Sequence, residues 1–128
     1  MKIENQVCTV DQSKKLIDLG ICKDAVNTWI WHTVLERFYV SDTTCFEMDI
    51  INATEEHYPA FTVAELSLML DDLEGIVGFD RESKKWFGEY NDPLFPTEAQ
   101  AKAALLMKFL ESEDNYINPE KCNKILSA

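Results

Sequence analysis

The sequence predicts an α+β protein in which antiparallel hairpins pack against helices in the order α-ββ-α-ββ-α-α. Two patterns predict this class: three helix-start signals are each followed by apolar residues at helical spacing, and between the helices the apolar residues recur at every second position. The chain has 128 residues, of which 46% are apolar, and this suits one domain with its own core. We therefore expect a single globular domain spanning residues 1–128.

The helix-start signals are capping boxes, in which a Thr is followed three residues later by Gln or Glu. The two side chains satisfy backbone N–H groups that lack partners at the start of a helix. The pairs are Thr9 with Gln12, Thr62 with Glu65, and Thr97 with Gln100. They predict helices over 10–19, 63–72 and 98–112, the first ended by Gly20 in a left-handed conformation. A short fourth helix is expected after Asn118, with Pro119 in its first turn.

The predicted strands cover residues 27–35, 45–51, 76–80 and 85–90. In the second of these, Phe46, Met48 and Ile50 alternate with acidic residues, which is typical of a half-buried strand. In the first, apolar residues fall on both sides, with Trp29 and Trp31 on one of them, so this strand is expected to be interior. A polar turn over 81–84 joins the last two strands into a hairpin.

The residue types that carry catalysis or bind cofactors do not form a recognisable motif. The chain has two histidines, and we expect His32 in the core and His57 in a polar loop. No phosphate-binding loop is present, and no close pair of Cys or His indicates a metal site, so neither a cofactor nor a metal is predicted. The four cysteines, Cys8, Cys22, Cys45 and Cys122, are expected to be reduced thiols. A non-catalytic protein is favoured, and an enzyme with carboxylates from distant positions stays an open alternative.

The net charge of −11, from 12 basic and 23 acidic residues, is the strongest compositional signal. It disfavours direct binding to nucleic acid and to anionic membranes, and it favours solubility or a basic protein partner. The N-terminus carries no apolar stretch after basic residues, so we expect no secretory signal and a cytoplasmic location. The most apolar stretch, residues 28–40, is too short and too polar to cross a bilayer.

Three stretches carry a family resemblance: residues 6–20, 59–70 and 97–110, the most specific part being Ala-Phe-Thr-Val-Ala-Glu-Leu at 60–66. Together they resemble small uncharacterised proteins of phages and prophages from Bacteroides-type bacteria. In that group a helix, an aromatic hairpin, this Ala-Phe-Thr motif and a late Ala-rich helix follow in the same order. The resemblance implies a mobile-element protein in the cytoplasm of a bacterial host cell, and it carries no catalytic residue to this chain.

Three functions remain open, and each would use different residues. The favoured one is binding to another macromolecule, a protein, through aromatic residues, because a few buried aromatic side chains usually dominate the binding free energy of an interface. The alternatives are an acidic inhibitor that mimics nucleic acid on a host defence or replication enzyme, and a small-ligand binder or enzyme with an aromatic pocket. The aromatic candidates are Trp29, Trp31, Trp86 and Tyr90, and the acidic candidates are Asp71, Asp72 and Glu74.

Overall fold

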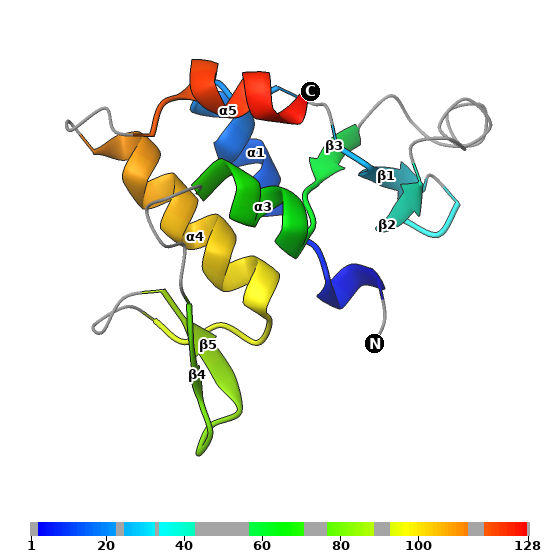
Figure 1. Ribbon diagram of the computed structural model, residues 1–128. Helices are drawn as coiled ribbons and strands as arrows, with labels where there is room; N and C mark the ends of the chain where they lie inside the picture. Colours follow the sequence, from blue (N-terminus) through cyan, green and yellow to red (C-terminus); the bar gives the residue numbers. More distant parts are fainter. Residues whose placement is uncertain are drawn as a thin grey trace.

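The computed structural model describes residues 3–22, 25–32, 34–42, 57–70, 77–88, 93–112 and 117–127. Its helices are η1 (Ile3–Asn5), α1 (Val10–Asp18), α3 (Val63–Leu70), α4 (Glu98–Glu111) and α5 (Pro119–Leu126). Its strands are β1 (Asn27–His32), β2 (Arg37–Asp42), β3 (His57–Ala60), β4 (Gly78–Asp80) and β5 (Lys85–Phe87). Two antiparallel sheets result, one of order β2-β1-β3 and one of order β4-β5, which confirms the predicted α+β class. Figure 1 shows the α-helices grouped between the two sheets.

The helices begin where the sequence predicts, because the caps form. The Thr9 hydroxyl accepts a bond of 3.1 Å from the Gln12 N–H, and the Gln12 amide oxygen accepts one of 3.1 Å from the Thr9 N–H. The Thr62–Glu65 box forms in the same way, with bonds of 2.9 and 3.2 Å. At α4 the Thr97 hydroxyl accepts from the backbone N–H of the third residue of the helix at 3.2 Å. These bonds satisfy N–H groups that a helix start leaves without partners.

The first helix ends in a Schellman motif built on Gly20, which has a φ of +104°. The Gly20 N–H donates to the Ile17 carbonyl at 2.9 Å, and the Ile21 N–H donates to the Leu16 carbonyl at 3.0 Å. Asn123 of α5 closes this turn from outside, since its side chain donates to the Gly20 carbonyl at 3.0 Å and accepts from the Cys22 N–H at 2.7 Å. The end of α1 is thus fixed against α5.

The main core lies among α1, α3, α4 and α5. Helix α3 packs against α4 and α5, and α1 packs against α4 and β3. The side chains that fill this space come from the apolar stripes predicted for the helices, together with the segments that flank them. The core residues are Cys8, Leu16, Ile21, Phe61, Leu66, Met69, Leu70, Ala99, Ala103, Leu105, Leu106, Ile117 and Cys122.

The three-stranded sheet differs from the prediction at the end of its first strand. Strand β1 stops at His32, a turn over 34–36 follows, and β2 pairs with β1 over its full length. Glu36 adopts a φ of +51° in this turn, and Val34 is 83% exposed rather than interior. Strand β1 therefore ends three residues earlier than expected, and its partner strand begins at residue 37, eight residues before the predicted start at residue 45. The strand predicted over 45–51 lies outside the described residues.

A third strand replaces the polar loop that was expected around His57. Strand β3 pairs with β1 on the side opposite β2, in a register that places His57 opposite Ile30 and Pro59 opposite Thr28. Proline cannot donate a backbone bond, and it is tolerated here because β3 is an edge strand. The Ser13 hydroxyl, fully buried on α1, donates to the Pro59 carbonyl at 2.6 Å and ties the sheet to the helices.

The second sheet is the hairpin of β4 and β5, which Figure 1 shows beside the start of α4. The Phe87 ring lies directly over Gly78, because a Cβ added there would come within 2.3 Å of the ring. Beyond β5 the chain forms a bridge, in which the backbones of Trp86 and Phe95 exchange bonds of 2.7 and 2.6 Å. This bridge connects the hairpin to the residues that begin α4.

Candidate functional site

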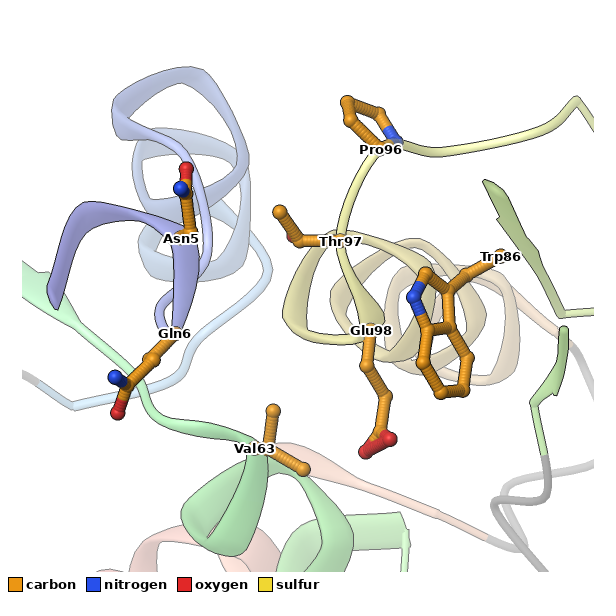
Figure 2. A pocket seen from close by; sticks show the side chains of 7 residues that line it. All are labelled: Asn5, Gln6, Val63, Trp86, Pro96, Thr97 and Glu98. Carbon is orange, nitrogen blue, oxygen red and sulfur yellow. The ribbon is translucent and has the colours of Figure 1, made fainter. Parts of the chain in front are cut away.

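A cleft of about 360 Å³ lies where the N-terminal segment, the start of α3, strand β5 and the start of α4 meet. Figure 2 shows its wall, with the N-terminal side chains across the cleft from the indole of Trp86. Such a volume lies near the lower end of the range for ligand pockets, which is about 300–1,000 Å³. The lining residues are Asn5, Gln6, Val63, Trp86, Pro96, Thr97 and Glu98.

Two backbone bridges hold the walls of this cleft in place. The bridge between Val7 and Thr62 sets the N-terminal segment beside the residue that precedes α3. The bridge between Trp86 and Phe95 sets the indole beside the first turn of α4. Four segments that are distant in sequence thus contribute one wall each, and a helix cap fixes the start of both α3 and α4.

The charged groups at the cleft are Glu98, which lines it, and Lys102, one turn further along α4. Their nearest atoms, Lys102 Nζ and Glu98 Oε2, are 3.7 Å apart. Lys102 is only 14% exposed, and its ammonium also donates to the Ser67 hydroxyl at 2.6 Å. That hydroxyl in turn donates to the Val63 carbonyl at 2.7 Å. A largely buried ammonium requires such partners, so this network is needed to hold Lys102. The Glu98 side chain keeps 31% exposure and stays accessible from the cleft.

On the hairpin side the cleft is lined by Trp86, whose ring contacts a second aromatic ring. Trp86 is half-buried, and its ring centroid lies 4.9 Å from that of Phe79 on β4, with 56° between the ring planes. Phe79 itself is 46% exposed, and Leu94, which precedes the bridging Phe95, is exposed as well. An exposed apolar ring next to the cleft residue Trp86 is suited to contact a partner, because its burial would bring a large gain in binding free energy.

The tryptophans predicted as one candidate site are not brought together. Trp29 lies in a core, 9% exposed, with its indole N–H donating to the Cys8 carbonyl at 2.8 Å. Trp31 is half-buried on the same sheet, where its ring meets that of Phe38 edge-on at 5.1 Å. Trp86 belongs to the other sheet, and Figure 1 shows the two sheets at different ends of the molecule. Of the remaining candidates, Tyr90, Asp71, Asp72 and Glu74 lie outside the described residues.

Most residues of the cleft carry no local signal in the sequence. Asn5, Gln6 and Pro96 are ordinary surface residue types, and Val63, Thr97 and Glu98 are explained by helix starts alone. Only Trp86 was a candidate from the sequence. The pairing of distant segments that brings the others to it has no sequence pattern short enough to recognise.

The thiols of the core are unreactive groups. Burial raises the pKa of Cys8 to about 12 and that of Cys122 to about 11, and both side chains are buried. A thiol with a raised pKa stays protonated at neutral pH and is a poor nucleophile and a poor metal ligand. Within the ranges that the structure describes, no three His, Cys, Asp or Glu side chains converge as a metal site would require. Among the same residues, no helix combines the length and apolar character needed to cross a membrane.

Comparison with protein-family models, with curated proteins and with solved structures finds no match to this chain.

Proposed function

We propose that the protein acts by binding another protein, without catalysing a reaction, and that the contact is centred on the cleft beside Trp86. The observation that carries this proposal is Trp86 in the lining of a cleft, with its ring in contact with the 46% exposed ring of Phe79. Tryptophan is enriched among the few residues that dominate the free energy of protein interfaces. The resemblance to phage and prophage proteins supports a partner that lies in the cytoplasm of a bacterial host cell.

The chemistry of the lining supports binding rather than catalysis. Apart from apolar groups, the described lining offers two amides, one hydroxyl, one carboxylate and the indole N–H of Trp86. The hydroxyl of Thr97 is already engaged as a helix cap, and the carboxylate of Glu98 already pairs with Lys102. General acid–base or nucleophilic catalysis needs a group with an adjusted pKa next to a reacting atom or to a base. A few polar groups in an apolar cleft are instead typical of a site that orients a bound group.

A second candidate follows from charge. The net charge of −11 supports an acidic surface that occupies the nucleic-acid site of a basic enzyme. This candidate and the cleft predict different responses to salt, because exposed charges more than about 10 Å apart are largely screened at 0.1 M ionic strength. A contact that depends on apolar burial would lose little affinity under the same change.

The test compares variants of the immobilised protein in capturing partners from a bacterial lysate. Phe79→Ala removes the exposed ring that contacts Trp86, and Val34→Ala is the matched control, since it removes an exposed apolar side chain from the turn between β1 and β2 of the other sheet. We expect Phe79→Ala to lose the partner that the unchanged protein and Val34→Ala both retain. The affinity for the purified partner is then measured at low and high salt. If both variants retain the partner equally and the affinity falls steeply with salt, the contact is made by the acidic surface and not by the cleft.

A further inference from the structure

We propose that the cleft receives the side chain of a lysine or arginine from the partner protein. This inference rests on the proposed function and names the chemical group that the cleft recognises. Its basis is the presence of a carboxylate and an indole in one cleft, since Glu98 and Trp86 both line it. In Figure 2 the Glu98 side chain extends from the start of α4 towards Val63, with the indole of Trp86 on the same side of the cleft.

These two groups recognise different parts of a basic side chain. The face of an indole attracts a cation through the ring quadrupole, and tryptophan is the strongest of the aromatic residues in this respect. A carboxylate attracts the same charge directly and accepts charge-assisted hydrogen bonds from it. The long methylene stem of Lys or Arg would meanwhile cover the apolar surface of Val63 and Pro96.

The charge of the cleft favours a cation over a neutral group. Glu98 is the only ionisable side chain of the lining that the structure describes. It stands in a protein with a net charge of −11, whose field raises the local concentration of basic groups and speeds their association. A volume of about 360 Å³ suits one long side chain of a folded partner better than a large cofactor.

The ion pair of Glu98 with Lys102 leaves capacity for a second cation. Lys102 lies 3.7 Å from Oε2, which is long for an ion pair, and its shorter bond of 2.6 Å goes to the Ser67 hydroxyl. An ionised carboxylate has about four acceptor sites over its two oxygens, so Glu98 can serve Lys102 and a bound cation together. The lysine of the protein therefore sits behind the carboxylate, on the side where Ser67 holds it, and does not line the cleft.

The test uses blocked tripeptides, acetyl-Gly-Lys-Gly-amide and its norleucine analogue, which has an apolar side chain of similar length without the charge. Binding is followed by NMR through the indole N–H signals, with that of Trp86 assigned by the Trp86→Phe variant. We expect the lysine peptide to shift the Trp86 signal in a saturable manner and the norleucine peptide to shift it at least tenfold more weakly. The signals of Trp29 and Trp31, which lie in the other sheet, should not move with the same saturation.

Glu98→Gln removes the negative charge of the cleft lining and should lower the affinity for the lysine peptide by about tenfold. Glu120→Gln is the matched control, because Glu120 also lies in the first turn of a helix and pairs with a lysine four residues on, Lys124, at 3.8 Å. Equal binding of the two peptides, or equal effects of the two variants, would overturn the assignment of a cation. If the Phe79→Ala variant still loses its protein partner in that case, the proposed function stands and only the recognised group is wrong. If both experiments give no effect, the proposed function fails as well.

Discussion

Replacing Gly20 by alanine should destabilise the protein by about 2–4 kcal/mol, because two costs add at this position. The φ of +104° is unfavourable for a residue with a Cβ, at about 1–2 kcal/mol. The new Cβ would also lie 2.9 Å from Pro119 Cβ and 3.1 Å from its Cγ, on a ring that cannot rotate away. Overpacking of this kind costs about 1–3 kcal/mol. Alanine also lowers the entropy of the unfolded chain, which offsets only about 0.4–1 kcal/mol of this destabilisation.

The assay is thermal unfolding followed by circular dichroism, and each kcal/mol corresponds to a fall of about 3–5 °C in the melting temperature of a chain of this size. Gly20→Asn separates the two costs, since asparagine brings the same Cβ but adopts positive φ more readily than alanine. We expect Gly20→Asn to recover about 1 kcal/mol of the loss and no more, because the contact with Pro119 remains. An alanine variant as stable as the original protein would refute the argument, and equal losses for both variants would assign the whole cost to Pro119.

Two further predictions concern buried polar groups. Ser13→Ala should lower the free energy of unfolding by about 1–3 kcal/mol, because the buried Pro59 carbonyl loses the donor that lies 2.6 Å from it. The control is Ser127→Ala at an exposed position, which should change the free energy of unfolding by less than about 0.5 kcal/mol. Both are measured by thermal denaturation, and equal effects would contradict the role of burial. For Cys8, whose pKa is raised to about 12, the protein's stability should contain a contribution that is complete below pH 9 and is lost as the pH rises from 9 to 12, since the unfolded thiol ionises first. The Cys8→Ala variant should therefore lose stability less steeply than the original protein over that interval, and parallel curves would show that the thiol does not contribute.

The helices could be predicted from the sequence because their boundaries are set by residues three positions apart. The bonds between Thr9 and Gln12 join residues within one turn of the chain. The left-handed conformation of Gly20 is likewise favoured by the residue type at that single position. The third strand could not be predicted, since its pairing with β1 is decided across about thirty residues and Pro59 argues against a strand unless the edge position is known. The end of β1 at His32 could not be predicted either, because the turn that follows contains no glycine and Glu36 adopts a positive φ in it.

The candidate site was predictable only in its aromatic component. Aromatic residues such as Trp86 attract attention in any sequence, but the difference between Trp86 at a cleft and Trp29 in a core depends on long-range packing. Trp29 and Trp31 do share one side of β1, as the alternation predicts, yet only the first has the carbonyl of Cys8 above it to accept its N–H. Glu98 could be recognised as a favourable residue for a helix start, and nothing nearby in the sequence indicates that it also lines a cleft.

The closure of the Gly20 turn by Asn123 has a consequence for the order in which the protein is made and folded. The two residues are 103 positions apart, and a ribosome adding about 5–20 residues per second needs about 5–20 s to pass from one to the other. During that interval the carbonyl of Gly20 and the N–H of Cys22 cannot form these bonds, because Asn123 has not been synthesised. The last helix therefore completes the first one, and native packing of the N-terminal part should follow translation rather than accompany it.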